Sequence, residues 1–231
     1  MEHLYEGTLQ RGNEAYYVKQ LQLKDVEEVL ALQSEVVEAL EVKSSLSALS
    51  REEYQYILRG KGVMIGAYVE NKLIAFRALL IPQLDDEHLG RDIGLQEDEL
   101  KEVIYQEISN VHPAYRGNRL QKTLAVIIMQ VLQQQMSQYR YVCCTVAPFN
   151  IPSLKDKFAQ GMEIAALKEK YGGKLRYIFV KKLDAATQEY RNELVSIPME
   201  DIERQQQMIA QGFRGIQMEK RDEAYWVKYV K

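Results

Sequence analysis

The sequence predicts a fold of the α/β (α+β) class, with a mixed central sheet flanked by helices on both faces. Short segments with alternating or continuous apolar residues predict strands, and longer segments with apolar residues at helical spacing predict helices. The two kinds of segment follow one another along the chain, which is the order that places helices over a sheet. With 231 residues, 46% of them hydrophobic and 27% charged, the chain can bury a sizeable core.

The first part of the chain is predicted to form a strand, two helices and a hairpin. Ser50-Arg-Glu-Glu53 has the capping-box pattern that begins a helix, and Gly60 lies near the end of that helix. Glu70-Asn-Lys72 separates two strand-like runs and predicts the turn of a hairpin. The elements other than this second helix are predicted at Val18–Leu23, Lys24–Leu40, Val63–Val69 and Leu73–Ile81.

The most informative segment is a turn between a predicted strand and a long predicted helix. Tyr105–Pro113 is predicted as a strand that the proline ends, and apolar residues recur at helical spacing from Leu120 to Leu132. Between them lies Arg116-Gly-Asn-Arg-Leu-Gln121. The first N–H groups of a helix lack partners within it and lie at the positive end of its dipole, so this turn predicts a phosphate-binding site.

A second pattern follows downstream. Tyr141–Ala147 is predicted as a buried strand, Asn150-Ile-Pro-Ser153 opens a short helix, and Gly161 closes it. Lys174–Lys182 is predicted as the next strand.

These two segments carry a resemblance to a known family. His112-Pro-Ala-Tyr-Arg-Gly-Asn-Arg-Leu-Gln121 resembles the acyl-CoA-binding motif of the GCN5-related N-acetyltransferases (GNAT), whose loop reads Gln/Arg-x-x-Gly-x-Gly/Ala. Asn150-x-x-Ser153, with an aromatic residue and a glycine after it, resembles the second motif of that family. The resemblance covers roughly residues 16–183 and implies the GNAT fold, with acetyl-CoA as acyl-donor co-substrate.

The resemblance also implies which residues hold the coenzyme. Backbone groups around Asn110 and Val111 would bind the pantetheine arm, and Asn150 and Ser153 would help to hold the coenzyme, although an N-terminal helix cap explains Asn150 equally well. The predicted phosphate turn consists of Arg116, Gly117, Asn118, Arg119, Leu120 and Gln121. Arg119 and Gln121 stand where the family usually has small residues. We expect Arg119 to lie in the first helical turn, where positive φ is not required.

Glu107 is the predicted catalytic residue. It lies on the predicted strand before the turn and, if the strand is regular, faces the same side as Tyr105, Ser109 and Val111. A buried carboxylate has a raised pKa and is suited to accept a proton from the attacking amine. An ordinary strand glutamate that reaches solvent is the alternative. The usual general-acid tyrosine of the family corresponds to Lys157, and Tyr171 and Tyr177 are alternative acids.

Composition excludes several other classes. The net charge of −3 and the mixing of charges argue against a nucleic-acid partner, and no segment approaches the apolar length of a membrane span. The N-terminus has no secretory signal, so a cytoplasmic protein is expected. Adjacent Cys143 and Cys144 are expected to be core residues, and the three scattered histidines predict no metal site.

Two segments exceed the family pattern. The insertion Gln83–Glu102 is rich in carboxylates and is interpreted either as a solvated surface or as an acidic rim that binds a cationic acceptor. Residues 1–183, with a short N-terminal hairpin, are predicted as the GNAT domain, and residues 184–231 as a C-terminal helix-plus-hairpin extension packed on it. Ala210-Gln-Gly212-Phe213 repeats the pattern of Ala159-Gln-Gly161-Met162.

The leading hypothesis is an N-acetyltransferase that moves acetyl from acetyl-CoA to a primary amine in a ternary complex. The acceptor would be a small molecule or a peptide, and the oligomeric state stays open. The alternative is a catalytically inactive acyl-CoA-binding or interaction module of the same fold, suggested by Arg119, Gln121 and Lys157. A third hypothesis, a relative with paired domains of this fold that transfers aminoacyl or peptidyl groups, is less well supported, because the second half of the chain is too short for a second such domain.

Overall fold

The computed structural model describes residues 3–40, 47–184 and 193–231. Its contacts divide the chain into two compact units, one formed by residues 1–82 and 105–137 and the other by residues 83–104 and 138–231. The predicted domain boundary near residue 183 falls within the second unit. Residues 185–192 of the predicted extension lie outside the described residues.

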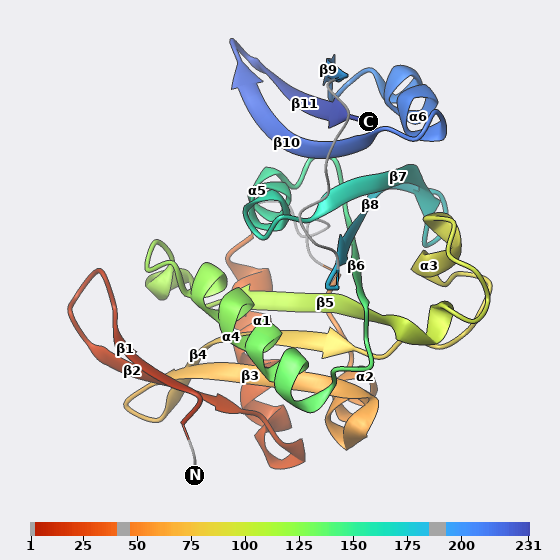
Figure 1. The fold of residues 1–231 in the computed structure, drawn as a ribbon. Coiled ribbons are helices and arrows are strands. Elements are labelled where there is room, and N and C mark those ends of the chain that lie inside the picture. The colour runs from red at the N-terminus through yellow and green to blue at the C-terminus, as the bar shows by residue number, and fades with distance from the viewer. Residues whose placement is uncertain (1–2, 41–46, 185–192) are drawn as a thin grey trace. The chain divides into compact units, whose positions relative to one another are not determined.

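The first unit contains an antiparallel sheet with the strand order β1-β2-β3-β4-β5 (Figure 1). Its strands are β1 (Tyr5–Thr8), β2 (Ala15–Gln20), β3 (Gly62–Val69), β4 (Lys72–Leu80) and β5 (Val103–Val111). The helices of this unit are α1 (Val26–Glu38), α2 (Arg51–Tyr56) and α4 (Leu120–Gln135). The predicted elements are therefore confirmed, including the capping box that Ser50 and Glu53 form at the start of α2.

Helices cover both faces of this first sheet, with α4 on one face and α1 on the other (Figure 1). One core cluster packs apolar residues of α1 and α2 against Phe76, Ala78 and Ile108 of the sheet. The other face receives the buried stripe of α4, which runs from Leu120 to Leu132 as its helical periodicity predicted. The candidate functional residues lie on β5 and on the turn that follows it.

β5 contains a bulge at Glu107. Ala78 pairs with Ile108 and Leu79 pairs with Gln106, so Glu107 is the extra residue between them. The expectation of a regular strand was wrong, because the bulge changes which side chains share a face. Gln106 points toward Arg77, whereas Ile108 lies in the core under α1 and α2. Bulges re-aim side chains in this way and occur often beside active sites.

The second unit contains an antiparallel sheet with the order β6-β8-β7-β10-β11-β9. Its strands are β6 (Tyr141–Val146), β7 (Glu163–Lys170), β8 (Lys174–Lys182), β9 (Leu194–Pro198), β10 (Arg214–Arg221) and β11 (Ala224–Val230). Its helices are α3 (Leu89–Asp92), α5 (Ile151–Ala159) and α6 (Ile202–Ala210). The predicted helix and terminal hairpin are confirmed, and β9 is a strand that sequence reasoning did not find.

The sequence echo noted around Gly161 and Gly212 is a structural repeat. The segment β6-α5-β7-β8 and the segment β9-α6-β10-β11 have the same element order, and in each the first strand pairs with the last. Both glycines have positive φ at the end of a helix. Ile164 and Gly215, each three residues after its glycine, pair with one another, so the strand order is symmetric about this contact.

Candidate functional site

The turn between β5 and α4 has the backbone conformation of an anion cradle. After a short 3₁₀ turn at Pro113–Tyr115, Gly117 adopts a φ of 83° and Arg119 a φ of 59°. A left-handed residue followed by a right-handed one, as at Arg119 and Leu120, points successive N–H groups into one concavity, which favours anions. The expectation that Arg119 lies in the first helical turn was wrong: Arg119 is the N-cap residue and is left-handed, the conformation that the family's glycine would supply without strain.

The side chain of Asn118 holds the turn to the β1–β2 hairpin. Its Oδ1 accepts a hydrogen bond from the Arg11 backbone N–H at 2.7 Å, and its Nδ2 donates to the Tyr115 carbonyl at 3.1 Å. The residue is only 8% exposed. Because both ends of this amide are engaged within the protein, a contribution of Asn118 to ligand binding would come from its backbone N–H.

A buried arginine positions the first turn of α4. Arg77 of β4 is 1% exposed and donates hydrogen bonds to the Gln121 carbonyl at 3.2 Å and to Gln106 Oε1 at 2.7 Å. Leu120 is buried against the sheet, and no side chain of Arg119 caps the helix. The turn thus presents its amides at the helix N-terminus beside the exposed side chains of Arg116 and Arg119.

His112 fixes the start of the turn from the α1 side. Its Nδ1 accepts from the Ala114 N–H at 3.1 Å, and its Nε2 lies 2.6 Å from the Glu35 carboxylate of α1. This arrangement assigns the imidazole proton to Nε2, which donates to Glu35. His112 therefore acts as a positioning residue for the turn.

Glu107 has the electrostatics expected of a base. Burial, followed by the nearby charge of Glu53, raises its pKa from the ordinary value of 4.5 to about 7. Its charge in turn contributes to the raised pKa of Tyr54, so the carboxyl lies toward α2, on the face that Ile108 occupies and not on that of Ser109. The Tyr54 hydroxyl donates its hydrogen bond to Gln33 Oε1 at 2.6 Å, and not to Glu107.

Two residues near the end of β5 carry unsatisfied polar atoms. Asn110 is 2% exposed, and its Nδ2 has no hydrogen-bond partner in residues 3–40, 47–184 and 193–231. The same holds for Ser109 Oγ within those ranges. Buried polar groups without partners are unusual and occur where a ligand or water completes them. Val111 ends the strand beside them and is partly buried.

The second motif lies in the second unit. Asn150 caps α5, its Oδ1 accepting from the Ser153 N–H at 3.2 Å, so the cap interpretation of Asn150 holds locally. Lys157, at the position of the family's acid, is 7% exposed and forms an ion pair with Asp156 at 3.3 Å. Tyr177 is buried, its hydroxyl donates to Gln205 at 2.8 Å, and burial raises its pKa, which argues against it as the acid.

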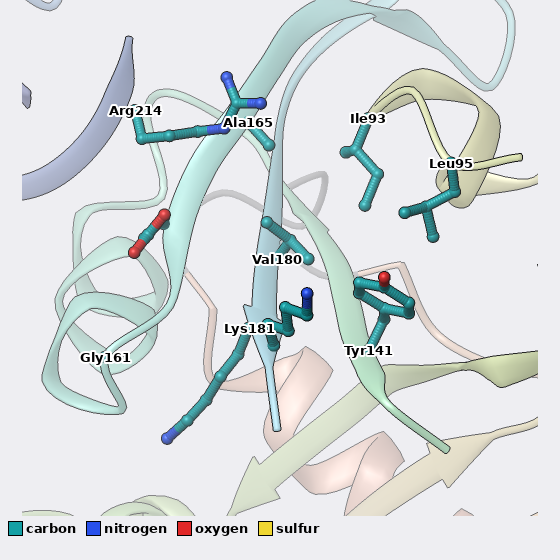
Figure 2. A pocket seen from close by; sticks show the side chains of 10 residues that line it. Ile93, Leu95, Tyr141, Gly161, Ala165, Val180, Lys181 and Arg214 are labelled. Carbon is teal, nitrogen blue, oxygen red and sulfur yellow. The ribbon is translucent and has the colours of Figure 1, made fainter. Parts of the chain in front are cut away.

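A pocket of about 290 Å³ lies within the second unit and contains none of the predicted site residues (Figure 2). Tyr141, Val180 and Lys182 line it together with Arg214 and Glu163. Burial raises the pKa of the Glu163 carboxyl, and Arg214 opposes that rise. The lining of the pocket comes from the second unit alone, and its volume lies just below the range of about 300–1,000 Å³ that is usual for small-molecule sites.

Several carboxylates of the acidic insertion form ion pairs within the second unit. Asp92 lies 2.7 Å from Lys168 and 3.0 Å from Lys170, and Glu102 lies 3.1 Å from Arg140. Glu97 pairs with Arg91. These cations offset part of the negative charge, which supports the surface interpretation for the paired carboxylates.

The remaining sequence-based candidates are structural. Cys143 and Cys144 are buried in β6, and burial raises the pKa of the Cys143 thiol well above its ordinary value. No group of three or more His, Cys, Asp or Glu side chains that could hold a metal occurs in the described part of the chain. No helix within those residues is long and apolar enough to cross a membrane.

Comparison with known proteins identifies the fold. No family model and no curated protein matches the sequence. The GNAT domain of S. lividans PAT superposes with a TM-score of 0.55 at 16% identity, covering 78% of this chain and 96% of that domain. The chain has the GNAT fold. The predicted α/β fold class, with a central sheet flanked by helices, is thereby confirmed.

Two further GNAT-fold neighbours contain coenzyme. The structure of yncA from Salmonella typhimurium, with its cofactor acetyl-CoA, superposes with a TM-score of 0.55 at 10% identity, covering 75% of this chain and 96% of that one. The PaiA N-acetyltransferase of Thermoplasma acidophilum, in complex with coenzyme A, gives a TM-score of 0.52 at 14% identity, covering 73% of this chain and 99% of that one.

Two residues that contact the turn were not predicted from the sequence. Arg77 lies in a hydrophobic run of β4, and its charge there was the signal that could have marked it, because an arginine is almost never fully buried without partners. Arg11 lies in the hairpin before the family-like region and carries no local signal. Its place beside the turn depends on tertiary contacts.

Proposed function

We propose that this protein transfers an acetyl group from acetyl-CoA to a primary amine, by direct attack of the amine on the thioester in a ternary complex. The amine nitrogen forms the new bond to the carbonyl carbon, the carbon–sulfur bond breaks, and coenzyme A leaves as its thiol. The acceptor belongs to the small-molecule or peptide amines.

The observation that carries the proposal is that one strand of a GNAT fold holds a carboxyl group of raised pKa and leads into a turn whose backbone conformation suits an anion. Glu107, with its pKa raised to about 7, lies on β5, and the same strand ends in the turn at Arg116–Gln121. Val111 lies four positions after Glu107, about 13 Å away at the rise of an extended chain. An elongated substrate with phosphates at one end and its reactive group at the other suits that separation.

The residues of the turn fit a coenzyme diphosphate. The backbone N–H groups of Gly117 through Gln121 lie at the N-terminus of a 16-residue helix, and the guanidinium groups of Arg116 and Arg119 are exposed beside them. Asn110 and Val111, next along the chain toward Glu107, would hold the arm of the coenzyme through their backbone groups.

Glu107 would take the proton that the amine must lose. An amine attacks only in its neutral form, and a base whose pKa lies near neutral pH combines a populated carboxylate with sufficient proton affinity. The departing thiolate would take its proton from solvent, because a thiol is far more acidic than an alcohol and Lys157 is held in an ion pair.

The buried Lys157–Asp156 pair supports a second candidate, an inactive coenzyme-binding module. A thiol-release assay with acetyl-CoA over a panel of amines, amino acids, aminoglycosides and polyamines separates the two. Acetyl transfer to at least one acceptor, lost in Glu107→Gln and kept in the exposed control Glu52→Gln, supports the enzyme. Coenzyme binding with no release above the solvent rate for any amine supports the module.

A further inference from the structure

The N-terminal hairpin brings an arginine to the phosphate turn. The tip of the β1–β2 hairpin is closed by a hydrogen bond from the Leu9 N–H to the Glu14 carbonyl at 2.9 Å, and Gly12 and Asn13 take positive φ there. Leu9 is 2% exposed and anchors the tip to the first unit. The tip of the hairpin is therefore held in a defined conformation, and Arg11 has a fixed position on it.

The guanidinium of Arg11 lies against Gly117. A Cβ added at Gly117 would lie 2.7 Å from Arg11 Cζ, 2.9 Å from Nη1 and 3.0 Å from Nη2. The backbone N–H of Arg11 is held by the buried amide of Asn118. Two independent contacts thus fix Arg11 beside the turn, one through its backbone and one through its side chain.

The charge of Arg11 is not paired with a carboxylate in the described part of the chain. No carboxylate among residues 3–40, 47–184 and 193–231 forms an ion pair with it, and the side chain is exposed. An arginine that lies beside the backbone amides of a helix N-terminus and has no anionic partner adds the planar N–H donors of its guanidinium to those amides. That geometry suits a phosphate.

We propose that Arg11 is a diphosphate-binding residue of the coenzyme site, contributed by the N-terminal hairpin from outside the β5–α4 motif. This inference rests on the proposed function, because it assigns a further ligand to the same site. It also gives Gly117 a second role: the absent side chain leaves room for the guanidinium as well as permitting a φ of 83°.

The test measures binding of coenzyme A, dephospho-coenzyme A and pantetheine to the intact chain and to Arg11→Gln. The first two ligands carry the diphosphate, and pantetheine carries no phosphate. Loss of one charged hydrogen-bonding group should weaken binding of the first two on the order of tenfold and leave pantetheine unchanged. Arg11→Lys should recover part of the loss, and Arg59→Gln, at another exposed arginine of the first unit, should bind as the intact chain does.

The outcomes separate this inference from the proposed function. If the intact chain binds coenzyme A no better than pantetheine, the phosphate site itself is wrong. If the intact chain prefers coenzyme A and Arg11→Gln keeps the same affinity, the site stands and the role of Arg11 is refuted. A loss confined to coenzyme A would place Arg11 on the 3′-phosphate, and an equal loss for pantetheine would make its role structural; either result overturns the diphosphate assignment.

Discussion

Arg77 of β4 donates a hydrogen bond to the carbonyl oxygen of Gln121 in the first turn of α4, with 3.2 Å between the two atoms. The same guanidinium binds Gln106, the residue before the bulge. One buried side chain therefore ties the strand that carries Glu107 to the helix that carries the phosphate turn. This link explains why a charged residue occupies a position of β4 that is 1% exposed.

Arg77→Met should destabilise the protein by about 1–3 kcal/mol, because it removes the charged hydrogen bond from Arg77 to the buried Gln106 Oε1. Urea unfolding measures the change. Adding Gln106→Leu should recover part of the loss, since removing both partners of a buried hydrogen bond costs less than removing one. Additive losses in the double variant would show that the two side chains are not coupled.

Glu107→Gln should lower the rate of acetyl transfer about 10²–10⁴-fold while leaving coenzyme affinity nearly unchanged. In the intact protein the rate should rise as the pH passes through about 7, where the carboxyl ionises, and this step should vanish in the variant. A pH–rate profile that keeps the same step in Glu107→Gln would remove Glu107 from the mechanism.

Glu107 should also make folding stability depend on pH. Its pKa is higher in the folded state, about 7, than the ordinary 4.5, so the stability linked to its protonated form is present below pH 4.5 and lost as the pH rises through 7. The shift corresponds to on the order of 3 kcal/mol. As the pH rises from 4.5 to above 7, Glu107→Gln should therefore gain stability relative to the intact protein. Denaturant unfolding of both proteins below pH 4.5 and above pH 7 measures the difference in the free energy of unfolding. Parallel curves for the two proteins would contradict the raised pKa.

Arg119→Gly should stabilise the protein by about 1 kcal/mol, because glycine adopts the left-handed φ of 59° without the cost that a side chain incurs. Arg119→Ala removes the same charge and keeps most of that cost, so it serves as the matched control. Comparing coenzyme affinities of the two variants separates the guanidinium from the backbone. If Arg119→Gly is no more stable than Arg119→Ala, the left-handed conformation is not a source of strain.

Gln205→Leu should destabilise the second unit by about 2 kcal/mol or more. Gln205 is fully buried, and its Oε1 accepts from the hydroxyls of Tyr177 and Tyr229, each at 2.8 Å, so the change leaves two buried hydroxyls without a partner. Gln207→Leu, at an exposed position of the same helix, is the control. Thermal unfolding compares them, and equal stability of the two variants would refute the role of this network.

Local patterns in the sequence determined most of the elements. The helix from Leu120, the capping box at Ser50, the glycine ends of α5 and α6, and the turn at Glu70–Asn71 depend on interactions within a few residues. The motif order then predicted the GNAT fold, because each motif requires a strand before it and a helix after it.

Only the tertiary structure decided how these elements are used. The bulge at Glu107 depends on the register that β5 takes against β4, and the left-handed Arg119 depends on how β5 and the anchored helix α4 meet. The place of Arg11 beside Gly117 joins positions 106 residues apart, through a hydrogen bond to the buried Asn118. No local propensity encodes such contacts, because their free energy arises from side chains that only the folded sheet brings together.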